Sequence, residues 1–209
     1  VGSEMCIRDS TQTNRSDALR NLVGKTGDAT KCSEIRFNND GTKVFVSSQD
    51  DKIYEFNLPT PFNLTNINYV AGSETALAEN FDFNEDGTKL YTIPDTTTNQ
   101  ILKEFTLDNA YDVTSSTLVR STDLSSIIVS NADTNTNDVP KSIMFSKDGS
   151  MMFVLLITNT NQRFQSLTFT DMIFQFKLAV PFDTSTLKFV GSSVVTSGFA
   201  DGSGDATFD

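Results

Sequence analysis

The most constraining feature of this chain is a repeat that occurs three times along its length. Each copy has an alternating apolar run, an Asp-Gly pair, a hydroxyl residue and a second apolar run. The copies span residues 35–46, 81–92 and 143–154. Their glycines, Gly41, Gly87 and Gly149, lie 46 and 62 residues apart. A period of about 40–50 residues indicates repeated supersecondary units that bury their apolar faces against one another.

Each copy continues in the same way, with a second alternating run, a short aromatic segment and a final short apolar run. The matching segments are 53–58, 102–107 and 173–178, then 61–63, 110–112 and 181–183, and finally 68–72, 116–120 and 188–191. Three matched units of this length make chance similarity improbable, so the repeat organises the whole chain.

The apolar residues of these runs recur with a period of two. Tyr54, Phe56 and Leu58, for example, alternate with Glu55 and Asn57. Successive side chains of a strand point to opposite faces, so this period predicts strands. The Asp-Gly pair between two runs is a hairpin signal, because glycine adopts a positive φ without steric cost. We find no stretch of 12 or more residues with helical spacing.

The predicted fold class is all-β: a β-propeller fragment of three complete four-stranded antiparallel blades, with partial blades at both ends. In the first unit the strands are expected near 34–37, 43–47, 52–58 and 67–71, with Ile35 and Phe37 on one face and Glu34 and Arg36 on the other. Stacked blades bury the Phe, Val and Leu side chains between neighbouring sheets. Within 11–209, the blades are expected at about 31–72, 77–121 and 138–192, and the partial blades at 18–24 and 204–209.

Residues 1–10 fit no periodicity and resemble the translated adapter sequence of environmental-sequencing reading frames. We treat them as non-native and leave them out of the fold prediction. The rest of the propeller is expected to be missing from this chain.

The run from Phe37 through Asp40-Gly41-Thr42-Lys43 to Val46 resembles the blades of YVTN-type, or lactonase-like, seven-bladed propellers. The resemblance covers roughly residues 18–209 as a blade-level pattern. It is not the WD40 pattern, which has Trp and a Gly-His pair, nor the kelch pattern, which has paired glycines. The family includes a sugar-lactone hydrolase and many surface proteins of unknown ligand. No residue of this chain matches a catalytic motif, so none is assigned a catalytic role.

Composition excludes several function classes. The net charge is −11 and no cluster of Lys or Arg offsets it, which disfavours nucleic-acid binding. The longest apolar run, residues 151–157, is much shorter than the ~20 residues of a membrane-spanning helix, so no membrane span is expected. The chain has no His, which removes every Ser-His and Cys-His mechanism.

Two long polar connections, 122–138 and 158–171, belong to the third unit and are expected at the same edge of its sheet. Long connections on a rigid scaffold often carry function, so they predict a polar ligand pocket. Its candidate residues are Asp133, Asn135, Asp138, Asn159, Asn161 and Arg163. The alternative, that both connections are surface insertions without a ligand, remains open. Glu34, Glu79 and Lys141 are expected to line the central channel, as a hydrated plug rather than a site.

No cofactor is expected, with calcium as the open alternative. The Asn/Ser-x-Asp-Gly turns lack the alternating oxygen ligands of a calcium loop, so we interpret them as turn chemistry. Residues 201–205 (Asp-Gly-Ser-Gly-Asp) could wrap a cation.

The first functional hypothesis is a non-enzymatic binding module of a secreted, cell-surface or virion protein, with an extracellular location. It would bind a protein or a glycan through the edge that carries the insertions. The absence of His, the acidity and the repetition favour it over an enzyme. Two alternatives remain: a lactonase-like hydrolase with carboxylates, with or without a divalent cation, over the channel, and a structural spacer. Fold alone does not decide between them.

Overall fold

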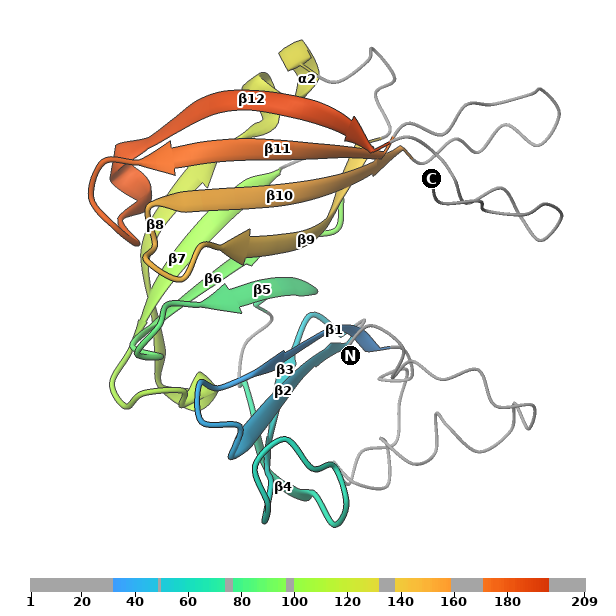
Figure 1. Ribbon diagram of the computed structural model, residues 1–209, viewed down its shortest axis with the longest axis vertical. Coiled ribbons are helices and arrows are strands. Elements are labelled where there is room, and N and C mark those ends of the chain that lie inside the picture. Colours follow the sequence, from blue (N-terminus) through green and yellow to red (C-terminus); the bar gives the residue numbers. More distant parts are fainter. Residues whose placement is uncertain are drawn as a thin grey trace, which may run out of the picture.

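The computed structural model describes residues 32–48, 50–73, 77–96, 100–131, 138–158 and 171–195. These residues form three four-stranded antiparallel sheets, each with its strands in chain order (Figure 1). The predicted three blades of a β-propeller are therefore confirmed. The predicted partial blades at 18–24 and 204–209, and the adapter-like residues 1–10, lie outside the described residues.

The first blade consists of β1 (Cys32–Phe37), β2 (Lys43–Ser48), β3 (Ile53–Asn57) and β4 (Asn68–Gly72). The second consists of β5 (Asn80–Phe83), β6 (Lys89–Ile93), β7 (Ile101–Leu107) and β8 (Ser116–Asp123). The third consists of β9 (Asp138–Phe145), β10 (Met151–Thr158), β11 (Asp171–Leu178) and β12 (Leu187–Val195). The 3₁₀ turns η1 (Val113–Ser115) and η2 (Thr184–Thr186) precede β8 and β12, and a short helix, α2 (Ser125–Asn131), follows β8.

The first strands of the three blades form the inner side of the assembly. β1 contacts β5, and β5 contacts β9, while each blade extends outward to its fourth strand (Figure 1). We call the side with the Asp-Gly turns, residues 38–42, 84–88 and 146–150, the turn edge. The opposite side, with the links from blade to blade, is the connection edge.

The apolar core lies between the blades, as predicted. Phe45 and Ile53 of the first blade pack against Phe81, Phe83 and Leu90 of the second. Tyr91, Ile93 and Leu102 of the second blade pack in the same way against buried residues of the third, including Ile143 and Phe145. Burial of apolar surface between neighbouring sheets is thus what holds one blade to the next.

An aromatic corner fixes the turn edge of every blade. Gly41, Gly87 and Gly149 have φ near +70°, and Phe62, Tyr111 and Phe182 also have left-handed φ values, of 57° to 62°. Within each blade the backbone N–H of the aromatic residue donates to the carbonyl oxygen of the glycine, at 2.9 Å for Phe62, 2.8 Å for Tyr111 and 3.1 Å for Phe182. The ring then covers the glycine so closely that a Cβ atom there would overlap it. The Asp-Gly turn is therefore tied to the turn between the third and fourth strands.

The turn aspartates act within their own turns, as the sequence predicts. Oδ1 of Asp40 accepts hydrogen bonds from the backbone N–H of Thr42 at 2.9 Å and from its hydroxyl at 2.6 Å. Asp86 makes the same two bonds with Thr88. These hydrogen bonds lower the pKa of both aspartates.

The connection after the second blade differs from its prediction as a polar loop. β8 extends to Asp123, and α2 follows at once, with Leu124 and Ile128 buried in the core between the second and third blades. The carboxylate of Asp123 accepts a 2.8 Å hydrogen bond from the N–H of Ser125 at the start of the helix. The first half of this connection is thus a structural part of the core. No helix among the described residues is long and apolar enough to cross a membrane.

Candidate functional site

Glu34 joins all three blades at the inner strands. Its Oε2 accepts a 2.9 Å hydrogen bond from the N–H of Phe81 in the second blade. Its Oε1 accepts a 2.7 Å bond from the hydroxyl of Ser142 in the third blade and pairs with Arg36 in its own strand. The carboxylate is buried, so these partners replace the water that it loses on folding.

Arg36 makes a second set of contacts across the inner strands. Its guanidinium donates to the carbonyl oxygen of Ile143 at 2.9 Å and to the hydroxyl of Ser142 at 3.3 Å. It also pairs with Asp82 at 3.4 Å between Nε and Oδ1. The other oxygen of Asp82 accepts a 2.8 Å bond from the N–H of Phe145. One arginine and two carboxylates therefore cross-link the three blades.

Burial has the largest effect on the pKa values of these two carboxylates. It raises the pKa of Glu34 and of Asp82 above their ordinary values. The nearby guanidinium of Arg36 opposes this rise, as do the hydrogen bonds that each carboxylate accepts, and the net direction is upward.

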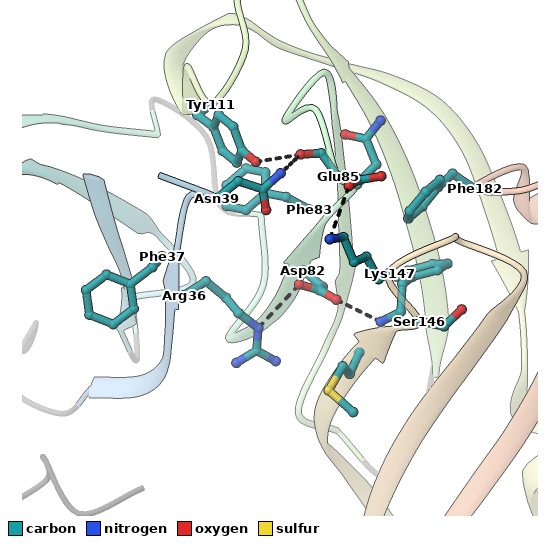
Figure 2. A pocket seen from close by; sticks show the side chains of 13 residues that line it. Arg36, Phe37, Asn39, Asp82, Phe83, Glu85, Tyr111, Ser146, Lys147 and Phe182 are labelled. Carbon is teal, nitrogen blue, oxygen red and sulfur yellow. Dashed lines mark hydrogen bonds and ion pairs between the residues drawn. The ribbon is translucent and has the colours of Figure 1, made fainter. Parts of the chain in front are cut away.

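A cavity of about 320 Å³ opens beside this network, toward the turn edge (Figure 2). All three blades line it. Its apolar lining consists of Phe37, Phe83, Tyr111, Met144, Phe145 and Phe182. Its polar lining consists of Arg36 and Asp82 from the network and of Asn39, Asn84, Glu85, Ser146 and Lys147 from the Asp-Gly turns. Met144 is 55% exposed, so the cavity presents an accessible apolar surface.

The rim of the cavity ties the Asp-Gly turns of neighbouring blades together. The carbonyl oxygen of Glu85 accepts a hydrogen bond from the side-chain amide of Asn39 and a 2.9 Å bond from the hydroxyl of Tyr111. Nζ of Lys147 lies 3.9 Å from a carboxylate oxygen of Glu85 (Figure 2). The Lys147 side chain is 90% exposed, so this cation stays free to turn toward a ligand.

This arrangement suits an apolar group more than a charged one. Arg36 and Asp82 form an ion pair, Glu85 and Lys147 lie close to each other at the rim, and the apolar part of the wall is aromatic or thioether. Aromatic, Met and Arg side chains around a small concavity are typical of binding surfaces. Among the described residues, no group of three or more Asp, Glu or Cys lies close enough to hold a metal ion.

The predicted polar pocket lies mostly beyond what the structure describes. Asp133, Asn135, Asn159, Asn161 and Arg163 all lie outside the described residues. Asp138 is the first residue of β9 and lies at the connection edge, opposite the cavity.

The three predicted channel residues tie blades together at the inner strands. Glu34 forms the network described above. Glu79 accepts a 2.7 Å hydrogen bond from the hydroxyl of Ser33 in the first blade. Lys141 of the third blade forms an ion pair with Asp95 of the second.

Sequence reasoning did not select Arg36, Asp82 and Met144, although the repeat contains a signal for them. In the aligned copies these three residues occupy the same position of the first strand. A repeat position that holds a cation in one copy, an anion in the next and an apolar residue in the third predicts contact between neighbouring blades at that position.

No protein-family model matches the chain, and no curated protein matches it. Solved β-propeller structures do resemble it. A putative 6-phosphogluconolactonase from Bacteroides fragilis has a TM-score of 0.48 and 14% sequence identity, over 82% of this chain and 41% of its own. The periplasmic gluconolactonase of Pseudomonas aeruginosa has a TM-score of 0.48 and 16% identity, over 82% of this chain and 42% of its own.

The β-propeller domain of Cps50 (Swd1) from Myceliophteria thermophila has a TM-score of 0.44 and 10% identity, over 78% of this chain and 42% of its own. The chain thus spans less than half the length of each of these three structures.

Proposed function

We propose that the chain is a non-catalytic binding module that receives an apolar side chain of a partner protein in the cavity at the turn edge. The observation that carries this proposal is the convergence of apolar side chains from all three blades on one cavity of about 320 Å³. A cavity of this kind can take one anchoring side chain of a partner, and such anchors dominate protein–protein binding energies.

The charges around the cavity support a protein partner. Arg36 pairs with Asp82 within the wall, whereas Lys147 and Glu85 lie exposed at the rim. A central apolar contact surrounded by exposed charges is the usual anatomy of a protein interface. The rim charges would then select the residues on either side of the anchor.

Panning a phage-displayed library of random peptides on the immobilised chain tests this function. We expect the recovered peptides to share an apolar anchor residue. Met144→Glu places a charge in the cavity and is expected to weaken a recovered peptide at least tenfold. Val190→Glu is the matched control, because Val190 is also 55% exposed but does not line the cavity. Recovery of no peptide, or equal binding to the Met144→Glu variant, would reject the proposal.

A glycan ligand is the other occupant that the sequence analysis considered. Binding of the same chain to a printed glycan array, lost in Met144→Glu and retained in Val190→Glu, would move the ligand class from protein to glycan. The site would then be correct and the partner class wrong.

One observation favours a hydrolase as a second candidate. The carboxyl group of Asp82 lines the cavity, and burial raises its pKa above the ordinary value, which is the direction that a general acid needs. Gluconolactone is a suitable probe, since it is the substrate named for one of the similar structures. A hydrolase predicts lactone opening faster than in buffer, and loss of that rate in Asp82→Asn. A rate equal to buffer rejects this candidate.

The polar pocket predicted from Asp133, Asn135, Asp138, Asn159, Asn161 and Arg163 remains a proposal for the connection edge, as does a secreted or surface-exposed location. Replacing Asp133 and Asn135 by Ala should then weaken a recovered peptide that contacts this edge, while the Met144→Glu variant still binds it. If neither edge binds any probe, the spacer alternative is favoured.

A further inference from the structure

The two interfaces between described blades are built alike. In the first, the ring of Phe45 contacts Phe83 at 4.7 Å and Tyr111 at 6.0 Å between centroids. In the second, the ring of Tyr91 contacts Phe145 at 4.3 Å, and its hydroxyl donates a 2.6 Å hydrogen bond to the carbonyl oxygen of Phe182. Each blade thus offers an aromatic residue of its second strand to a first-strand Phe and a corner aromatic of the next blade.

The third blade offers the same surface, but nothing described covers it fully. The residue equivalent to Phe45 and Tyr91 is Phe153, which is half-buried, whereas both equivalents are completely buried. Ile173 is 38% exposed, whereas its equivalents Ile53 and Leu102 are buried.

Cross-strand pairing places these side chains on one face. Phe153 is paired with Gln175, and Leu155 with Ile173. Cross-strand partners point to the same face of a sheet. We call Phe153, Leu155 and Ile173 the acceptor face.

The first blade carries an exposed apolar surface that is complementary to the acceptor face. Ile35 is 39% exposed, although its equivalents Phe81 and Ile143 are fully buried against the preceding blade. Phe62, the corner aromatic of this blade, is 60% exposed, and its ring lies 5.5 Å from that of Phe37. We call Ile35, Phe37 and Phe62 the donor edge.

We propose that the acceptor face of one chain binds the donor edge of a second copy of the same chain, so that the copies join head to tail. The repeat register supplies the fit: Phe153 would meet Phe37 and Phe62 as Phe45 meets Phe83 and Tyr111. Both surfaces are apolar, and their burial drives association. Because the two surfaces differ, the contact is heterologous and either closes into a ring or continues as an open chain.

The acceptor face lacks a charged pair that both occupied interfaces contain. The two occupied interfaces carry lysine–glutamate pairs, Lys43 with Glu55 at 2.6 Å and Lys89 with Glu104 at 2.8 Å. In the third blade the equivalent residues are Met151 and Gln175. At these two positions the acceptor face therefore joins the donor edge without burying a charge. Lys177, the cross-strand partner of Met151, is exposed, as are its equivalents Asn57 and Thr106.

Sedimentation velocity of the full 209-residue chain over a concentration series tests the proposal. We expect a mass above that of one chain, rising with concentration. Ile173→Glu damages the acceptor face, and Phe62→Asp damages the donor edge with a residue that tolerates the left-handed backbone. Each variant alone is expected to weaken association at least tenfold.

Mixing the two variants identifies the contact as head to tail. Phe62→Asp retains an intact acceptor face and Ile173→Glu an intact donor edge, so their equimolar mixture should form a species of two chains. Val119→Glu, which charges an apolar residue that is 52% exposed on the middle blade, should associate like the original chain. Leu155→Glu provides a second acceptor variant if Ile173→Glu loses its far-ultraviolet circular dichroism.

Three results would overturn the proposal. The original chain could remain a single chain at all concentrations. The mixture of folded variants could remain single chains, which would indicate a symmetric contact elsewhere. Association could also be lost in Val119→Glu, which would place the contact on the outer strands.

Discussion

At the scale of single residues, the aromatic corner predicts how a substitution at its glycine changes stability. Gly87 has a φ of +72°, and a Cβ there would overlap the ring of Tyr111. Gly87→Ala should therefore lower the free energy of unfolding by about 3 kcal/mol, through backbone strain and displacement of the ring. Gly191→Ala is the control, since its Cβ would meet nothing within 4 Å, and should change stability by less than about 0.5 kcal/mol. Equal effects in urea unfolding would contradict this account of the turn edge.

Arg36 is the second residue whose role can be measured directly. Arg36→Met leaves the carboxylates of Glu34 and Asp82 without their cation inside the inner strands. We expect a loss of about 3 kcal/mol at pH 7, as for other broken partly buried ion pairs. Arg120→Met is the control, since Arg120 is exposed and its carboxylate contacts are 3.9 Å and 4.0 Å long.

The pH dependence separates this electrostatic role from simple packing. The folded-state pKa values of Glu34 and Asp82 lie above their unfolded values of 4.5 and 3.8. Their contribution to stability is therefore present below those values and is lost as pH rises through the raised folded pKa values. Without Arg36 both pKa values rise further. The stability difference between Arg36→Met and the original chain should thus shrink from pH 7 to pH 4, whereas a packing defect would keep it constant.

At the scale of elements, α2 is a structural part of the core rather than a surface insertion. Leu124→Ala should cost about 3 kcal/mol, because Leu124 is completely buried between the second and third blades. Ser126→Ala, at an exposed position of α2, is expected to be nearly neutral. A loss below about 1 kcal/mol for Leu124→Ala, measured by urea unfolding, would show that the residue leading into α2 is not needed for the core.

The strands were predictable from sequence because their signals are local. The period-two runs and the Asp-Gly turns specify the strands of each blade and the hairpins that join them. α2 was missed because it has only seven residues and because the buried side chains, Leu124 just before it and Ile128 within it, lie in a segment rich in Ser and Asn. Local composition cannot show that such a segment meets a neighbouring blade.

The candidate site was not predictable in the same way. Arg36, Asp82 and Met144 converge only because the blades are packed at a particular angle, which no local pattern specifies.

The predicted alternation of the first strand was also incomplete as a guide to burial. Glu34, expected on the polar face, is buried between blades, whereas Ile35 is 39% exposed. Which face of a strand is covered depends on the neighbouring blade, not on the polarity of the residue.

At the scale of the whole molecule, stability and association should be linked. At the two described interfaces Phe45 and Tyr91 are buried against the neighbouring blade, so a second copy that covers the acceptor face stabilises the folded chain by mass action. The midpoint of thermal unfolding should therefore rise with protein concentration in the original chain. In Ile173→Glu the midpoint should depend much less on concentration, because that variant weakens the contact that covers the acceptor face. A concentration-independent midpoint in the original chain would mean that the three blades are stable without a covering partner, and that the exposure of Ile173 and Phe153 carries no cost in folding.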